Sequence, residues 1–118
     1  MEQVERPWGN YTVIGAKNDL QTKQIVVNPN SRLSLQKHEH RREIWFVIEG
    51  TPLIEVEDEK FVGSPGTVVI VEKGEVHRIS APGDRVVIIE VQIGDYLGED
   101  DIVRLEDDYG RIEEGPVL

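Results

Sequence analysis

Residues 34–43 read Ser-Leu-Gln-Lys-His-Glu-His-Arg-Arg-Glu, and this polar stretch lies between the apolar runs 25–27 and 44–48. Side chains alternate between the two faces of a strand, so Gln36, His38 and His40 share one face. Glutamine and histidine are unusual in an apolar core, because buried polar groups need partners. We therefore interpret this face as the wall of a cavity, where a metal ion would supply the partner.

Two further side chains complete the predicted metal site. Glu43 begins the next predicted strand and faces the same cavity, and His77 arrives from a distant segment. The predicted ligands are two imidazoles, a carboxylate and an amide oxygen, from Gln36, His38, Glu43 and His77. This mixed nitrogen and oxygen set suits one divalent ion of Zn, Mn, Co, Fe or Ni, and it leaves the choice among them open.

Short β-rich runs separated by turn signals recur along the chain and predict an all-β sandwich or barrel. The expected strands are Tyr11–Ile14, Lys23–Val27, Arg32–His38, Glu43–Glu49, Leu53–Glu57, Thr67–Val71, Val76–Ser80 and Val86–Gln92. A short helix is predicted over Glu99–Asp108, where acidic residues crowd the start and favour the helix dipole. The last residues, from Ile112 to Leu118, are expected to be loosely held.

Length and charge restrict the class of protein. The 118 residues fit one domain, expected to span 1–118. The net charge of −10 argues against nucleic acid and against anionic membrane surfaces as partners. The absence of cysteine excludes disulfides and thiolate metal sites. No signal-like or membrane-spanning apolar run is present, so a cytoplasmic location is expected.

The spacing of the polar residues resembles the two cupin motifs. It reads Asn30-x5-Gln36-x-His38-x4-Glu43-x6-Gly50, followed by Gly66-x7-Gly74-x2-His77. Gln36 occupies the position of the first motif histidine. In this exchange the chain resembles the type II phosphomannose isomerases, or mannose-6-phosphate isomerases. Those cupin domains are often fused behind a mannose-1-phosphate guanylyltransferase. Similarity to this family extends over about residues 6–111, in the segments 6–11, 33–45, 77–78, 89–104 and 109–111.

The resemblance implies a fold and a reaction. The fold would be a single cupin barrel, also called a double-stranded β-helix or jelly roll, with the short C-terminal helical segment. The reaction would interconvert mannose 6-phosphate and fructose 6-phosphate through an enediol. The sequence departs from the family at Ile44, where histidine is usual, and at Glu72, where proline is usual.

The isomerase hypothesis also needs a general base and a phosphate site. Glu90 and His40 are the candidate bases, and Arg104 lies in the most family-specific segment. Arg32 shares the inward parity of Gln36, which predicts that it points into the barrel mouth. The candidate catalytic and substrate-binding residues are Glu90, His40, Arg32, Arg41, Arg104 and Arg111. Trp45 is a further candidate, either as a sugar-stacking wall or as part of the core.

Two other classes of function stay open at this point. A non-catalytic cupin would bind a sugar phosphate or nucleotide sugar, and a cupin dioxygenase would use Fe, although Gln36 fits the usual oxygenase ligand set less well. The small-molecule partner expected on the isomerase hypothesis is a sugar phosphate. A homodimer is also expected, because small barrels with exposed edge strands have reason to pair.

Overall fold

Twelve strands and no helix are found in residues 1–112, the part of the chain that the computed structural model describes. The strands are β1 (Gln3–Arg6), β2 (Gly9–Lys17), β3 (Leu20–Val27), β4 (Ser31–Arg32), β5 (Leu35–Lys37), β6 (Arg41–Glu49), β7 (Leu53–Val56), β8 (Glu59–Val62), β9 (Val68–Val71), β10 (His77–Ala81), β11 (Val86–Gly94) and β12 (Val103–Glu106). The all-β prediction is confirmed. The expected loose tail falls almost wholly on residues 113–118, outside the described part.

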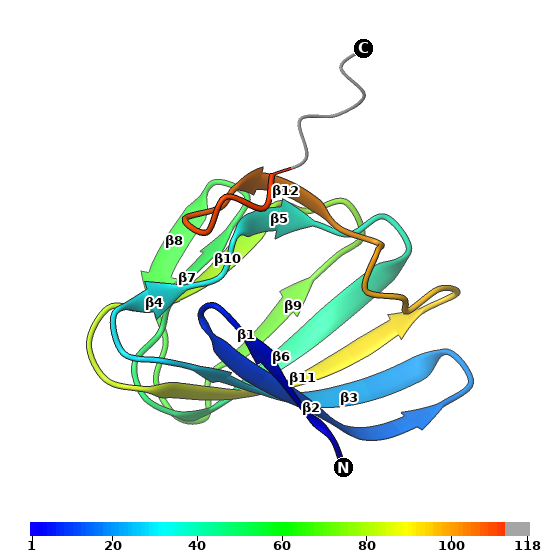
Figure 1. Cartoon of the computed structure of the whole chain (residues 1–118), viewed down its shortest axis with the longest axis horizontal. Coiled ribbons are helices and arrows are strands. Elements are labelled where there is room, and N and C mark those ends of the chain that lie inside the picture. Colours follow the sequence, from blue (N-terminus) through cyan, green and yellow to red (C-terminus); the bar gives the residue numbers. More distant parts are fainter. Residues whose placement is uncertain (113–118) are drawn as a thin grey trace.

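The strands form two sheets that face each other across the interior (Figure 1). One sheet has the order β1-β2-β3-β11-β6-β9, and the other has the order β12-β5-β10-β7-β8, with β4 also paired to β10. All the strand pairs are antiparallel, and most join strands distant in sequence, such as β3 with β11 and β6 with β11. This is the jelly-roll barrel predicted from the sequence. No helix within residues 1–112 has the length and apolar character to cross a membrane.

The inward face of the first sheet changes from apolar to polar along each central strand. The antiparallel register places these changes at one level, because Glu90 lies beside both Lys23 and Trp45, and Gln92 lies beside Glu43. The apolar inward positions on β3, β6 and β11 are Ile25, Val27, Trp45, Val47, Val86 and Ile88, and the polar ones are Lys23, Arg41, Glu43, Glu90 and Gln92. The barrel therefore has an apolar core at one end and a polar interior at the other.

The apolar end supplies most of the packing. Its buried side chains come from both sheets and form one contiguous cluster, to which Trp8, Leu33, Ile54 and Ile79 also belong. Full burial of each large apolar side chain contributes on the order of 1.5–3 kcal/mol to folding. That stability can offset the cost of keeping charged and polar groups buried at the other end.

The predicted C-terminal helix is wrong, because residues 103–106 form strand β12. β12 pairs with β5, with Arg104 opposite Gln36, so the segment takes part in a sheet. The acidic residues that suggested a helix start have another role: the Asp101 carboxylate accepts hydrogen bonds from the backbone N–H groups of Glu39 and His40, both at 3.0 Å. These bonds tie the segment to the end of β5 in an extended conformation.

Candidate functional site

Three buried side chains at the polar end could hold a metal ion: His38, just after β5, Glu43 on β6, and His77 at the start of β10. One donor atom from each residue lies within 4.8 Å of the others. The Nε2 atom of His38 is 3.3 Å from Oε2 of Glu43, and the Nε2 atom of His77 is 3.8 Å from Oε1 of Glu43. The structure thus brings together three of the four predicted ligands, from three separate segments of the chain.

Both imidazoles are oriented by backbone carbonyls. The Nδ1 atom of His38 lies 2.6 Å from the carbonyl oxygen of Asp101, and the Nδ1 atom of His77 lies 3.0 Å from that of Glu75. A carbonyl only accepts hydrogen bonds, so each ring carries its proton on Nδ1 and presents an Nε2 lone pair. Partners of this kind commonly orient histidines that bind metals.

The chemistry of these donors fits a metal ion. The Nε2 atom of His77 is buried and has no hydrogen-bond partner among residues 1–112, which is costly unless another group uses its lone pair. Burial lowers the pKa of the His38 imidazole to about 4, so this ring is neutral at pH 7, as a ligand must be. Burial raises the pKa of Glu43, but the charge of Arg41 and the hydrogen bond from the Trp45 indole are among the effects that outweigh it, so the carboxylate stays ionised.

Gln36 lies next to this group of donors. It is opposite His77 in the β5–β10 pairing, it is buried, and it lines the same cavity as His38 and Glu43. Its Oε1 atom accepts a hydrogen bond of 3.3 Å from the Ser34 hydroxyl. An amide oxygen in this position is available as a fourth ligand, and its role as a ligand stays a prediction.

Arg41 approaches the donor atoms from inside the barrel. Its Nε donates to Oε2 of Glu43 at 2.8 Å, and its Nη2 donates to Nε2 of His38 at 3.2 Å. The side chain is only 6% exposed, so these charged hydrogen bonds are well shielded from water. Arg41 lines the cavity, and its predicted substrate-binding role stays a prediction.

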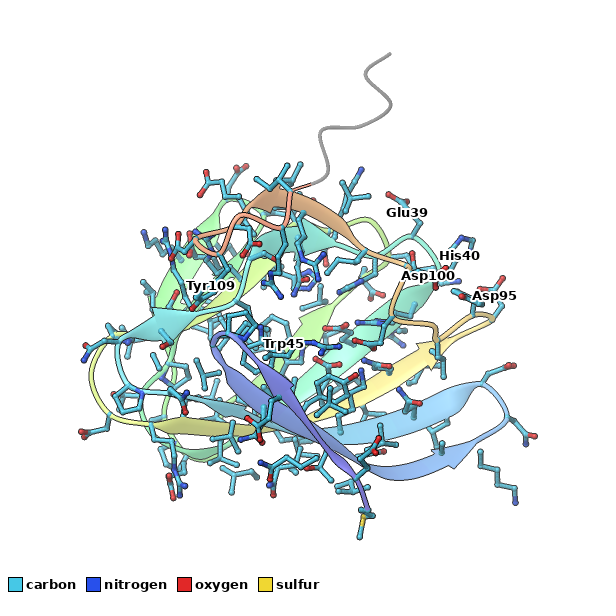
Figure 2. The ribbon with its side chains drawn as sticks, in the orientation of Figure 1. Glu39, His40, Trp45, Asp95, Asp100 and Tyr109 are labelled. Atoms are coloured by element: carbon cyan, nitrogen blue, oxygen red, sulfur yellow. The ribbon has the colours of Figure 1, made fainter. Side chains whose placement is uncertain are left out.

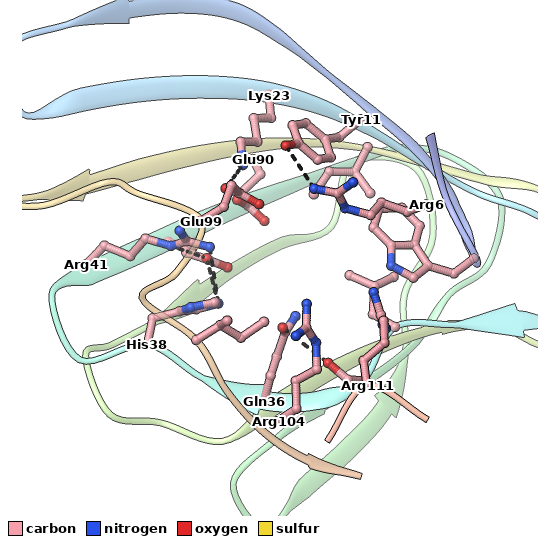
Figure 3. Close-up of a pocket in the computed structure, with 16 residues that line it drawn as sticks. Arg6, Tyr11, Lys23, Gln36, His38, Arg41, Glu90, Glu99, Arg104 and Arg111 are labelled. Atoms are coloured by element: carbon pink, nitrogen blue, oxygen red, sulfur yellow. Dashed lines mark hydrogen bonds and ion pairs between the residues drawn. The ribbon is translucent and has the colours of Figure 1, made fainter. Parts of the chain in front are cut away.

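His38, Glu43 and Gln36 line a cavity with ≈ 560 Å³ of empty space, counted to its open mouth. Figure 3 shows His38 and Arg41 on one side of the cavity, with Arg104, Arg111 and Arg6 across from them. The cavity therefore has a metal-binding side and a cationic side.

Arg104 is the cationic group with the fewest partners. Its Nε atom is buried, and nothing in the described chain accepts a hydrogen bond from it. Burial and repulsion from Arg111 lower the pKa of Arg104. Arg111, by contrast, is held by the Asp107 carboxylate through hydrogen bonds of 2.8 and 3.0 Å, and Arg6 lies 3.5 Å from the Tyr11 hydroxyl. An anion placed among these groups would satisfy Arg104.

Glu90 is a buried acid on the wall of the same cavity. Burial raises the pKa of its carboxyl to about 8, and the charge of Glu43 adds to the effect. Gln92 donates a hydrogen bond to it from the same strand. Close by, the buried Lys23 is paired with Glu99. A carboxyl group with a pKa near neutrality, facing a cavity, has the properties of an acid–base catalyst.

Two predicted site residues lie at the surface, away from the cavity. His40 points away at the rim, where its side chain is 54% exposed and lies 3.6 Å from Asp95 (Figure 2). Strand β5 ends at Lys37, so the alternation that placed His40 inward has stopped. Arg32 is 42% exposed and paired with Asp108 at 2.7 Å. The break between β4 and β5 interrupts the alternation that predicted it to point inward.

Trp45 belongs to the core and does not line the cavity. The side chain is 1% exposed, so no sugar could stack on it. Its indole N–H donates to Oε1 of Glu43 at 2.9 Å, and its ring meets the His77 ring edge-on. Of the two roles considered for Trp45, core packing is the one that the structure supports, together with orientation of Glu43.

Sequence reasoning missed several residues of the cavity. Arg6, Lys23, Tyr11 and Glu99 all line it, although none was a predicted site residue. Lys23 and Glu90 are neighbours in the β3–β11 pairing, and an inward parity from Ile25 and Val27 could have indicated Lys23. Arg6 carries no such signal, because strand β1 was not expected.

The sequence family described as "Mannose-6-phosphate isomerase C-terminal" matches residues 1–107. The alginate biosynthesis protein AlgA of Pseudomonas aeruginosa is 46% identical over 113 residues, which cover 95% of this chain and 24% of AlgA. The mannose-1-phosphate guanylyltransferase ManC of Salmonella typhimurium is 40% identical over 111 residues, covering 93% of this chain and 23% of ManC. The chain thus spans about a quarter of the length of these relatives.

Solved structures agree on the fold. An RmlC-like cupin from Shewanella frigidimarina superposes with a TM-score of 0.74 at 17% identity, covering 84% of this chain and 86% of the other. At this identity the likeness concerns the fold alone, and it agrees with the cupin barrel expected from the motifs. The family match over residues 1–107, together with the relatives at 40% identity and above, shows that the chain belongs to the mannose-6-phosphate isomerase C-terminal family of cupin domains.

Proposed function

We propose that this chain is a metal-dependent isomerase that interconverts mannose 6-phosphate and fructose 6-phosphate. The observation that carries the proposal is the division of one cavity into a side with metal-binding donors and a side with arginines. A sugar phosphate has the same two ends: hydroxyl and carbonyl oxygens at C1 and C2, and a dianionic phosphate at C6. The name of the family and the name of the relative ManC support the same substrate class.

A divalent ion held by His38, Glu43 and His77, with Gln36 as a fourth ligand, would supply a Lewis acid for the sugar oxygens. The donor set suits Zn, Mn, Co, Fe or Ni. Arg104, with Arg6 and Arg111 beside it, binds the phosphate through charged hydrogen bonds, because arginine matches phosphate geometry well. These contacts orient the sugar so that C1 and C2 face Glu90.

Glu90 is the base in this proposal. Its carboxylate takes the proton from C2 of the aldose and returns it at C1. A second proton passes from the oxygen on C2 to the oxygen on C1. The intermediate between the two sugars is an enediol. His40, the other candidate base, points into solvent and is dropped from this role.

The proposal is tested by a coupled assay for fructose 6-phosphate, with mannose 6-phosphate as substrate and added Co²⁺, Mn²⁺ or Zn²⁺. Free mannose serves as the matched control, since it lacks the group that the arginines would bind. We expect product from the phosphate ester alone. Binding of mannose 6-phosphate without product would favour a non-catalytic sugar-phosphate cupin, and substrate-dependent oxygen uptake would favour a dioxygenase.

The Arg104→Gln variant should raise KM for mannose 6-phosphate by about tenfold to a hundredfold, because a charged hydrogen bond to the phosphate is lost. Inhibition by inorganic phosphate should weaken by a similar factor. The matched control is Arg32→Gln, which removes the same charge from an arginine that is paired with Asp108 outside the cavity. An unchanged KM in the Arg104 variant, or an equal rise in both, would rule out this phosphate site.

We also propose that the chain forms a homodimer through an outer apolar face, made of Phe46 and Ile48 on β6 and Val68 and Ile70 on β9. These four side chains are 37–55% exposed, and the β6–β9 register places Phe46 directly beside Val68. β9 ends its sheet, so the face reaches a free edge. Apolar, uncharged side chains can meet a second copy of themselves without repulsion.

Phe46→Glu should convert the dimer to a monomer at micromolar concentration, since it would bury a charge in the interface. Val62→Glu is the matched control, because Val62 is an exposed apolar residue on β8 of the other sheet. Sedimentation equilibrium gives the mass of each protein. A wild-type mass of one chain would refute the dimer, and so would an unchanged mass in Phe46→Glu.

The cytoplasmic location stays a prediction.

A further inference from the structure

Arg41 donates hydrogen bonds to two of the atoms that a metal ion would need. Its Nη2 reaches Nε2 of His38 at 3.2 Å, and its Nε reaches Oε2 of Glu43 at 2.8 Å. A carboxylate oxygen has two lone pairs and can serve two partners, but Nε2 of a neutral imidazole has one. The Nδ1 atom of His38 faces a carbonyl, so this ring cannot offer a lone pair on its other nitrogen.

We propose that Arg41 is an exchangeable internal cation: its guanidinium holds His38 and Glu43 until a divalent metal ion takes their lone pairs, and it then turns away from His38 into the cavity. This inference rests on the metal site proposed above and adds a competition between that metal and a side chain of the same chain. It makes Arg41 a residue that sets metal affinity, in addition to the substrate-binding role predicted from the sequence.

The surroundings of Arg41 allow such a movement. Its Nη1 atom is buried and already lacks a hydrogen-bond partner within residues 1–112, so the present position does not satisfy the whole guanidinium. Arg41 lines the same cavity as Glu90 and Glu99, both of which are acidic (Figure 3). The cavity therefore offers the carboxyl groups of Glu90 and Glu99 to a guanidinium that leaves His38, although Glu99 is already paired with Lys23.

Charge gives the same conclusion. A divalent ion and a guanidinium beside one buried carboxylate repel each other, and burial makes such repulsion stronger than in water. The usual partner of a metal-bound carboxylate or histidine supports metal binding, and its removal costs about tenfold to a hundredfold in affinity. Removal of a competing cation changes the metal affinity in the opposite direction, because it strengthens metal binding. The two roles of Arg41 are thus distinguished by the direction of one measured change.

The first experiment measures Co²⁺ affinity at pH 8 by visible absorption, in competition with a chelator, for wild type and Arg41→Gln. We expect the variant to bind about tenfold more tightly or better, which corresponds to the loss of one charged hydrogen bond to the competing cation. Arg42→Gln is the matched control, because Arg42 follows Arg41 in the sequence but is paired with Glu72 on the outer surface. The control should bind Co²⁺ as wild type does.

The second experiment follows the Nε–H resonances of arginine in wild-type protein by ¹H–¹⁵N NMR, with Arg41 assigned from its absence in Arg41→Gln. One equivalent of Zn²⁺ should shift the Arg41 signal and leave that of the exposed Arg32 in place. Weaker Co²⁺ binding by Arg41→Gln, or an Arg41 signal that does not move when Zn²⁺ is bound, would overturn the inference while keeping the metal site. Failure of wild type and variant to bind either ion would overturn both.

Discussion

Replacing Glu90 by glutamine should lower kcat for the isomerisation of mannose 6-phosphate by about 10²–10⁴, the usual contribution of a general base. Glutamine has nearly the same shape and can still accept the hydrogen bond from Gln92, so KM should change little. Steady-state kinetics of the metal-loaded proteins measure both constants. The exposed acid Glu49, which is paired with Arg85, provides the control Glu49→Gln, with kinetics expected to match wild type.

The pH dependence of turnover gives a second test of Glu90. The base acts in its ionised form, and burial raises the pKa of Glu90 to about 8. Wild-type kcat/KM should therefore rise with pH up to this region, and the residual rate of Glu90→Gln should lack that rise. A variant that keeps the wild-type rate and pH profile would show that another group moves the proton.

The raised pKa also has a consequence for stability. The folded protein keeps a proton on Glu90 that the unfolded chain loses above the ordinary pKa of 4.5. This contribution to the free energy of unfolding is complete below pH 4.5 and is lost as pH rises through about 8. As the pH rises from 6 to 9, through the pKa of Glu90, the thermal midpoint of chelator-treated wild type should therefore fall more than that of Glu90→Gln.

Replacing His77 by alanine should abolish stoichiometric metal binding and reduce turnover to background. The change removes one of three donor atoms that lie within 4.8 Å of one another, and no other histidine can reach the site. We expect Co²⁺ affinity to fall by at least about a hundredfold, with loss of the visible absorption of the bound ion. Absorption spectroscopy and metal analysis after gel filtration provide the measurement.

His40→Ala is the matched control for the His77 variant, because it removes the exposed histidine at the rim of the barrel. This variant should keep one metal ion per chain and wild-type turnover. Circular dichroism checks that the His77 variant is folded, since the side chain is buried and its loss leaves a small cavity. A folded His77→Ala protein with one tightly bound ion would place the metal elsewhere.

Most of the barrel could be predicted because its strands alternate regularly. Trp45 and Val47 face inward while Phe46 and Ile48 face outward, so a period of two is visible in the sequence. The metal donors followed from the same alternation, since Glu43 has the parity of Trp45. The spacing of the two motifs identified His77 as a ligand, and the structure adds that its strand pairs with the strand of Gln36.

The C-terminal segment could not be predicted because its structure depends on tertiary contacts. Val103 and Leu105 are half exposed, so β12 carries no buried apolar stripe from which its type could be inferred. Pairing with β5 and the hydrogen bonds from Arg78 to Glu106 hold it in place. A local pattern of acids followed by apolar residues favours a helix, and these distant contacts override it.

The two misplaced site residues show where alternation stops being informative. Arg32 lies before the break between β4 and β5, and His40 lies after β5 has ended. The alternation of side chains between the two faces can be counted only within a continuous strand. Neither of these strand boundaries has a strong turn signal in the sequence. The cationic side of the cavity was only partly predicted for a similar reason. Arg104 was identified through family resemblance, whereas Arg6, although it opens a family-like segment, lies on strand β1, which has too few apolar residues to be recognised.

We propose that this chain isomerises a sugar phosphate at a metal centre made by His38, Glu43 and His77. The most direct test is a ¹H NMR time course of mannose 6-phosphate with the purified chain, once stripped by a chelator and once reloaded with Co²⁺ or Zn²⁺. Fructose 6-phosphate should appear with the reloaded protein and not with the stripped one. A reloaded protein that binds one ion and broadens the sugar-phosphate signals, yet leaves mannose 6-phosphate unchanged, would contradict this proposal.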